Sequence, residues 1–457
     1  MAADCPAGPV TDEEFASRCD DLNLSGPFAV AVSGGRDSMA LALLAASYAR
    51  TTGARVTAFT VDHGLRPEAA DEARRAAGWC ESLGLIHRTL RWEGEKPTAG
   101  LQAAAREARY YLLAAAAETS GVNTILTGHS ADDQAETVFM RLARGAGPRG
   151  LAAMDEESLI AAGAGAPVRL LRPLLRFSRA RLTATVEAAG QGYVDDPYND
   201  DPAFERIRTR ALLAALEEQG LLMQRALLKT AERMRAADRR LEAQCADLFR
   251  RAAGCFYGWG GAALQRSAAA AMGSEEAGAL AARLLHAVSG EAHRPDEDAA
   301  AAALDATLAS GAATLGGALI KSLRDRVWFL REPAAVLGRA GAPAIGEITP
   351  AAGAVLNWDG RFIIEVSGEN IAVAPLGEAG SSALGFRKDL FAGPPEGLLA
   401  LPAAYRNGEL IAAAGGLFTS TGEFAARQLA SERFRGGIIR FSPGPGFRSP
   451  PHGAGLS

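Results

Sequence analysis

Two short segments of this sequence contain residue types that could bind a nucleotide and move a proton. The first is Ser33-Gly34-Gly35-Arg36-Asp37-Ser38, which follows an apolar run at 28–32. Glycines let a backbone approach an anion closely, and free N–H groups at a helix N-terminus attract negative charge. Ser33 and Ser38 add hydroxyl donors. Asp37 is unexpected beside phosphates unless it holds a cation, so we expect it to bind Mg²⁺, directly or through water.

The second segment combines a histidine with three acids: His129, Asp132, Asp133 and Glu136. If a helix starts near residue 131, Glu136 lies about one turn from both Asp residues. Carboxylates grouped in this way can hold Mg²⁺ or accept a proton from a nucleophile. Helix capping would explain one such Asp, but it does not explain all of these residues together.

The elements that must position these segments are strands alternating with helices. The strand candidates are apolar or β-branched runs at 28–32, 56–61, 85–92, 123–127 and 168–175. The helix candidates between them are 39–50, 67–83, 101–119 and 131–144. This alternation predicts an α/β fold with a doubly wound parallel sheet and helices on both faces. Ligands of such sheets collect at the carboxyl ends of strands, where both segments fall. An ordinary strand–turn–helix junction remains the alternative for the Gly-Gly segment.

Composition excludes several classes of protein. The chain has 457 residues and a net charge of −5, so it is not a wholly basic nucleic-acid binder. Residues 141–181 nevertheless carry eight arginines against three acids, which indicates either a phosphate-binding face or a solvated one. The five cysteines include no C-x-x-C pair, which argues against zinc-ribbon and iron–sulfur sites and favours a reducing compartment. No signal peptide and no membrane span are evident, so we expect a cytoplasmic protein.

The first segment lacks the lysine of G-x-x-x-x-G-K-[ST] and resembles the SGGxDS loop of the PP-loop ATP pyrophosphatases. Residues 128–137 resemble the GHHxDDQAET element of tRNA(Ile)-lysidine synthetases, a family within that superfamily. Further similar segments follow in the same order over residues 28–213, among them VDHGLR at 61–66 and RPLL at 172–175. Ser130 replaces the second His of GHH, and Ile207 replaces an Asn between two arginines.

The resemblance implies a two-step reaction. The wobble cytidine of a tRNA(Ile) with a CAU anticodon attacks ATP and is adenylated, and free L-lysine then displaces AMP to give lysidine. The implied catalytic residues are Asp132, Asp133, Glu136, Arg106 and His129. ATP would bind Ser33, Gly34, Gly35, Arg36, Asp37, Ser38, Asp62 and His63, with Mg²⁺ at Asp37. The tRNA would bind Arg144, Arg179, Arg206, Arg208 and Arg210. The last three alternate in sequence, so in an extended segment they would point to one side.

Two alternatives stay open. One is another PP-loop enzyme such as a tRNA thiolase, although such enzymes usually carry paired cysteines that this sequence lacks. The other is a nucleotide-binding module without catalysis.

The expected organisation is a lead-in (1–26), the PP-loop domain (27–218), a mainly helical domain (219–333), a linker (334–357), a small C-terminal region (358–441) and a disordered tail (442–457). Helical runs are expected at 212–234 and 279–308. The sequence does not decide the oligomeric state, and a dimer is compatible with it.

Overall fold

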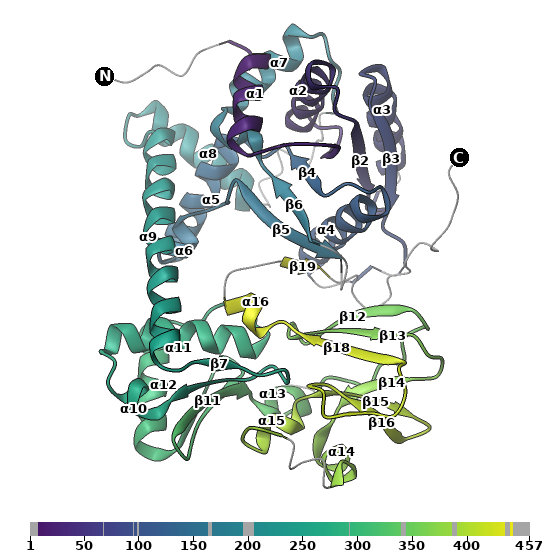
Figure 1. The fold of residues 1–457 in the computed structure, drawn as a ribbon. Coiled ribbons are helices and arrows are strands. Elements are labelled where there is room, and N and C mark those ends of the chain that lie inside the picture. Colours follow the sequence, from purple (N-terminus) through teal and green to yellow (C-terminus); the bar gives the residue numbers. More distant parts are fainter. Residues whose placement is uncertain are drawn as a thin grey trace. The chain divides into compact units, whose positions relative to one another are not determined.

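The computed structural model describes residues 8–66, 68–94, 96–97, 100–162, 167–194, 205–291, 293–339, 344–385, 391–434 and 439–441. The chain divides into two compact units, Met1–Arg239 with Ile439–Ser457, and Arg240–Ile438 (Figure 1). Within the described residues, no helix is long and apolar enough to cross a membrane. The tail predicted to be disordered, 442–457, lies outside the described residues.

The first unit is built on a seven-stranded sheet with the order β19-β5-β6-β4-β1-β2-β3 (Figure 1). Its strands are β1 (Phe28–Ala31), β2 (Val56–Asp62), β3 (Ile86–Arg91), β4 (Thr124–Thr127), β5 (Glu157–Ala162), β6 (Val168–Leu171) and β19 (Ile439–Phe441). From β6 to β3 every neighbouring pair is parallel, which confirms the predicted sheet. Strand β5 was not predicted; it pairs antiparallel with β6, and β19 adds to its other edge.

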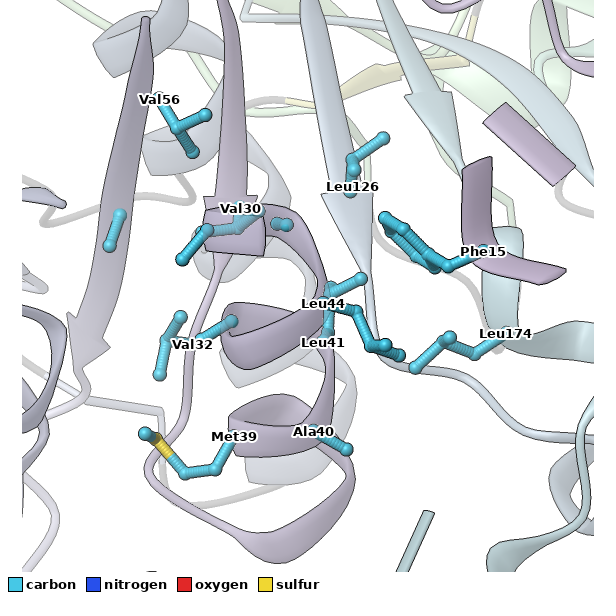
Figure 2. Close-up of a cluster of buried hydrophobic side chains, with 14 of the residues drawn as sticks. Phe15, Val30, Val32, Met39, Ala40, Leu41, Leu44, Val56, Leu126 and Leu174 are labelled. Atoms are coloured by element: carbon cyan, nitrogen blue, oxygen red, sulfur yellow. The ribbon is translucent and has the colours of Figure 1, made fainter. Parts of the chain in front are cut away.

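Helices cover both faces of this sheet. The helices of this unit are α1 (Asp12–Asp21), α2 (Arg36–Thr52), α3 (Ala69–Ser82), α4 (Leu101–Thr119), α5 (Ala131–Ala143), α6 (Pro148–Leu151), α7 (Arg179–Ala188) and α8 (Glu205–Glu218), with a 3₁₀ turn at Pro173–Arg176. Of these, α6 and α8 pack on α5. Neighbouring residues of one strand point to opposite faces. Val30 and Leu126 accordingly pack into one core with α1, α2 and α7, as Figure 2 shows for Phe15, Leu41 and Leu44. Ala29 and Ile125 pack into a second core with α4. The central strands β1 and β4 are therefore almost entirely buried, whereas β3 at the edge of the sheet contains His87, Arg88 and Arg91 and is mostly exposed.

Two stretches predicted as continuous helix are each broken at a glycine. Residues 212–234 are divided between α8 and α9 (Gln224–Arg251), with Gly220 between them at φ +68°. Residues 279–308 are divided between α11 (Ser274–Ser289) and α12 (Glu297–Ser310), with Gly290 at φ +78°. Glycine tolerates this left-handed conformation, which ends a helix. The composition of both stretches indicated helix correctly but did not locate the breaks.

In the part of the second unit that the structure describes, helices accompany three antiparallel sheets. Its five-stranded sheet has the order β7-β8-β11-β10-β9, built from β7 (Cys255–Phe256), β8 (Ala262–Gln265), β9 (Ala312–Leu315), β10 (Ala318–Leu323) and β11 (Arg326–Arg331). Helices α11 and α12 pack on it, and these strands were not predicted. The three-stranded sheet comprises β12 (Ala354–Trp358), β13 (Phe362–Val366) and β18 (Phe424–Gln428). The four-stranded sheet comprises β14 (Ala372–Pro375), β15 (Pro402–Arg406), β16 (Glu409–Ala413) and β17 (Phe418–Thr419).

Short helices connect these strands. They are α10 (Arg266–Ala270), α13 (Pro333–Leu337), α14 (Gly377–Ala383), α15 (Glu396–Leu399) and α16 (Ala430–Phe434). The segment expected to be a linker, 334–357, contains most of α13 and of β12, and is described except at 340–343.

Candidate active site

The Gly-Gly segment forms the turn between β1 and the first turn of α2. Gly34 has φ +85°, and a Cβ added there would lie 3.3 Å from Val194 Cγ2. Gly35 is the N-cap of α2 and provides no side chain to cap the helix. The first N–H groups of a helix have no partner within it, so this end of α2 presents backbone donors and a favourable dipole to an anion.

The two serines of this segment brace the turn. Ser38 Oγ donates to Gly35 O at 2.7 Å and accepts from Ser33 N–H at 3.2 Å. Ser33 Oγ donates to Ser38 Oγ at 3.2 Å and accepts from Gly35 N–H at 3.4 Å. Both hydroxyl protons are therefore used inside the turn, and the backbone donors left for a ligand are N–H groups other than those of Ser33 and Gly35. Donation by these hydroxyls to a phosphate stays a prediction.

Arg179 joins the acids of the two segments into one cluster. Its guanidinium contacts Asp37 Oδ2 at 3.4 Å, Asp133 Oδ1 at 3.1 Å and Glu136 Oε1 at 3.3 Å. Its backbone N–H donates to Asp132 Oδ2 at 2.6 Å. The side chain is only 14% exposed. The sequence predicted Arg179 as a tRNA-binding residue and did not connect it with the acids; the only signal was its place after Ser178, the N-cap of α7.

Glu136 is the most enclosed acid of the cluster, with 2% of its side chain exposed. Besides Arg179, it accepts from Arg206 Nε at 2.8 Å and from Arg210 Nε at 2.9 Å. The expectation of an extended arginine segment is wrong, because residues 205–218 form α8. Residues four apart share a helix face, so Arg206 and Arg210 reach the same acid, whereas Arg208 starts from another face. Arg144 pairs with Glu205 at the start of α8.

Ser130 begins α5 with a capping box. Asp133 Oδ2 accepts from Ser130 N–H at 2.8 Å and from its hydroxyl at 3.1 Å, and Asp133 N–H donates back to Ser130 Oγ. Burial raises the pKa of Asp133, but Arg206 and the Ser130 N–H outweigh it and hold the pKa below its usual value. Asp133 thus has a structural role as well as a place in the cluster. Burial raises the pKa of Asp37, although Arg179 opposes this shift.

Gly128 brings the two segments into contact. A Cβ at this position would lie 2.9 Å from Asp37 O and 3.2 Å from Ser38 Cα, which are backbone atoms of the first turn of α2. Only glycine lets the end of β4 approach this turn so closely.

We expect Gly128→Ala to displace the first turn of α2. The cost in unfolding free energy should be about 1–3 kcal/mol, as for other overpacked sites. Misplaced N–H donors should weaken ATP binding on the order of tenfold or more. Denaturant titration and nucleotide titration measure the two effects. Gly78→Ala, in α3 with open space around it, is the matched control. Wild-type ATP affinity in Gly128→Ala would contradict the expectation.

Asp62, His63 and His129 lie at or just after the ends of β2 and β4, and Arg106 lies in the second turn of α4. Asp62 Oδ1 accepts from Gly64 N–H at 2.8 Å, which holds the turn after β2. His63 lies edge-on to Trp92, and burial and Arg109 lower its pKa to about 4. His129 Nδ1 lies 3.0 Å from Thr127 Oγ1, and burial and Arg172 lower its pKa to about 4. The Arg106 guanidinium lies 4.9 Å above the ring of Tyr110.

The lowered pKa of His129 predicts a pH dependence of stability. Unfolded histidine takes up a proton near pH 6.5, whereas folded His129 does so only near pH 4. Between pH 6.5 and pH 4 the unfolded state therefore binds more protons than the folded state. The contribution of neutral His129 to the free energy of unfolding is complete above pH 6.5 and is lost as the pH falls toward 4. The slope of the unfolding free energy against pH is proportional to the number of protons taken up on unfolding. In denaturant titrations, His129→Gln should reduce this number by up to about one. An unchanged slope would contradict this.

The site fits Mg²⁺ only together with a phosphate ligand. Within the described ranges, no group of three or more His, Cys, Asp or Glu side chains is placed to hold a metal alone. Asp37 nevertheless places one half-buried carboxylate beside the uncapped N-terminus of α2. Mg²⁺ commonly binds through one or two carboxylates plus substrate phosphates, so this donor set fits a nucleotide-bound ion.

Comparison with known proteins agrees with this geometry. Residues 12–216 match the PP-loop domain family. The tRNA(Ile)-lysidine synthase of Bradyrhizobium sp. (strain BTAi1) is 51% identical over 226 residues, 48% of this chain and 60% of that protein. The one from Mesorhizobium japonicum is 40% identical over 374 residues, 78% of this chain and 76% of that protein. The one from Methylobacterium sp. (strain 4-46) is 39% identical over 345 residues, 72% of this chain and 96% of that protein.

The extent of these matches differs. The chain spans 58–60% of the length of the two Bradyrhizobium relatives, but three quarters or more of the Mesorhizobium and Methylobacterium proteins. The match to the PP-loop domain family includes both polar segments and residues 205–216 of α8. The chain belongs to the tRNA(Ile)-lysidine synthase family.

Proposed function

We propose that this chain joins free L-lysine to C2 of the wobble cytidine in a tRNA(Ile) with a CAU anticodon, using ATP and releasing AMP and pyrophosphate. The observation that carries the proposal is one arginine, Arg179, that links four acids to the uncapped N-terminus of α2. An anion site beside an acidic site suits a reaction between a nucleotide and an amine. Family membership supports the same activity. We place the reaction in the cytoplasm, where tRNA and lysine are both present.

In the first step, the O2 oxygen of cytidine attacks the α-phosphorus of ATP. The bond from this phosphorus to the bridging oxygen breaks, and pyrophosphate leaves. The N–H groups of α2 and the Arg36 guanidinium would hold the departing phosphates. Asp37 would hold Mg²⁺, which when bound neutralises phosphate charge. Arg106 is proposed for the α-phosphate, and Asp62 and His63 for the nucleoside end.

In the second step, the ε-amine of lysine attacks C2 and the bond from C2 to the AMP oxygen breaks. A cavity of about 110 Å³ beside the acids is proposed for lysine; it is lined by Asp132, Ala135, Glu136, Arg210, Leu213, Ala214, Glu217, Leu222 and Gln224. The apolar residues suit the methylenes of lysine, and the carboxylates suit its ammonium groups.

An ammonium group cannot attack, so a carboxylate must first take its proton. Asp133 has both oxygens engaged, by Ser130 and by Arg179. Asp132 has one oxygen engaged, by the Arg179 N–H, and its other oxygen has no hydrogen-bond partner in the part of the chain that the structure describes. Asp132 is therefore the proposed base.

The tRNA phosphates are proposed to bind Arg144, Arg206, Arg208 and Arg210. The side chains of Arg144, Arg206 and Arg210 are 40–61% exposed although each is paired with an acid, so they can exchange partners with a phosphate. Arg179 is enclosed, and we assign it to the acid cluster instead of the tRNA.

The test is product formation with a transcript bearing the CAU anticodon. We expect pyrophosphate release to require the tRNA, and AMP release and incorporation of labelled lysine to require both tRNA and lysine. The same transcript with a GAU anticodon, which lacks the wobble cytidine, is the control and should remain unmodified. Release that needs a sulfur donor would point to a thiolase, and absence of release to a binding module; either result would overturn the proposal.

Filling the cavity tests its assignment to lysine. Ala214→Leu adds bulk at the cavity wall, so we expect the KM for lysine to rise about tenfold while pyrophosphate release stays near wild type. Glu218→Leu changes an exposed residue at the end of the same helix outside the cavity and serves as control. An unchanged KM would remove lysine from this cavity.

A further inference from the structure

Thr127, the last residue of β4, makes two contacts with its buried hydroxyl. Thr127 is 6% exposed, and its Oγ1 lies 3.0 Å from His129 Nδ1 and 3.5 Å from the backbone oxygen of Leu171. A carbonyl oxygen can only accept a hydrogen bond, so the hydroxyl proton points to Leu171. The lone pairs of Oγ1 then face Nδ1, which must carry a proton to complete the second contact. Both contacts are satisfied together only in this tautomer.

We propose that Thr127 is a positioning residue that holds His129 as the Nδ1–H tautomer and leaves the Nε2 lone pair as an acceptor in the active site. Nε2 has no hydrogen-bond partner among the residues that the structure describes, so it is available to a substrate. The tautomer follows from the contacts of this chain alone. Its use in catalysis rests on the proposed function.

The surroundings of His129 explain why an unpaired acceptor matters here. Glu136 is held by three arginines, and Asp133 by Ser130, Arg179 and Arg206. These contacts occupy both oxygens of each acid. Arg172 lies near His129. Among the described residues no acid pairs with the Arg172 guanidinium, whose Nη1 donates to Asp155 O and Ser158 Oγ. This cation and burial favour the neutral imidazole. A neutral ring with Nε2 unprotonated accepts an N–H of lysine or of the cytidine amine, whereas the other tautomer would present a donor to both.

Nitrogen-15 spectra of the histidine side chains test the tautomer directly. The full-length protein is labelled at its six histidines, and His129 is assigned by its loss in His129→Gln. In the wild type at neutral pH we expect Nδ1 protonated and Nε2 unprotonated. Thr127→Val, which keeps the shape but removes the hydroxyl, should lose this preference, and Thr127→Ser should keep it. Thr124→Val is the control, a buried threonine of the same strand whose hydroxyl contacts Asn123.

A wild-type spectrum with Nε2 protonated would overturn the proposal, as would an unchanged tautomer in Thr127→Val. The wild-type spectrum decides the tautomer by itself, so a variant that fails to fold leaves the test intact. Activity is measured separately: Thr127→Val should slow turnover on the order of tenfold, and Thr127→Ser should restore it. Slower pyrophosphate release identifies the cytidine amine as the donor, and slower lysine transfer alone identifies lysine. The expected tautomer in a protein without lysidine formation would contradict the proposed function but not the role of Thr127.

Discussion

Asp37→Asn is expected to stop pyrophosphate release, lowering its rate on the order of 1,000-fold, while the protein stays folded. An amide keeps the shape of the carboxylate but loses the charge that a phosphate-bound Mg²⁺ needs. Burial raises the pKa of Asp37, which means that the folded protein holds this charge at a cost. Removing the charge should therefore leave the melting temperature unchanged or raise it, as is common where a functional residue is not optimal for stability.

The controls for this variant separate a lost site from a lost fold. Asp71→Asn makes the same change in the first turn of α3, at an exposed residue paired with Arg74, and should keep wild-type activity. Rates of pyrophosphate release and thermal melting curves are measured on both variants. If Asp37→Asn retains the wild-type rate, the assignment of Asp37 is wrong. If it loses activity and melts at a lower temperature, the loss reports unfolding and not chemistry.

Glu136→Ala is expected to have the largest effect on stability. Glu136 is 2% exposed and accepts from three arginines, so its removal leaves Arg179, Arg206 and Arg210 without a shared acceptor. Breaking a buried ion pair from one side costs about 3–5 kcal/mol when the remaining charge stays buried. Arg206 and Arg210 are 43% and 40% exposed and can be solvated, so we expect a cost near or below the lower end of that range. Since two of the arginines belong to α8, we expect this helix to detach from α5 and become cleavable by protease, and activity to fall together with it.

Urea unfolding and limited proteolysis measure this effect. Glu218→Ala, an exposed acid at the end of α8, is the control and should change the unfolding free energy by less than about 0.5 kcal/mol. Glu136→Gln keeps an acceptor oxygen and should cost less than the Ala variant. A stability and cleavage pattern equal to the control would show that the three ion pairs contribute nothing to holding α8.

Long helices and buried strands of the first unit could be predicted from sequence because their signals are local. The predicted helix 101–119 coincides with α4, and the predicted strand at 56–61 differs from β2 by one residue. Edge strands could not be predicted in this way. Strand β5 pairs with β6 and β19, which comes some 280 residues later in the chain, so its conformation depends on partners that no local pattern reveals.

For the site, the sequence by itself determined the two polar segments and their position at the carboxyl ends of β1 and β4, because residue type and the order of strand and helix are local properties. It also determined the family. Only the tertiary structure decided which charges meet: Arg179 reaches Asp37 across 142 residues and Glu136 across 43, and α8 brings Arg206 to Glu136 across 70. Ion pairing depends on distance in space, and that distance is fixed by the packing of α7 on α2 and of α8 on α5, which sequence spacing does not contain.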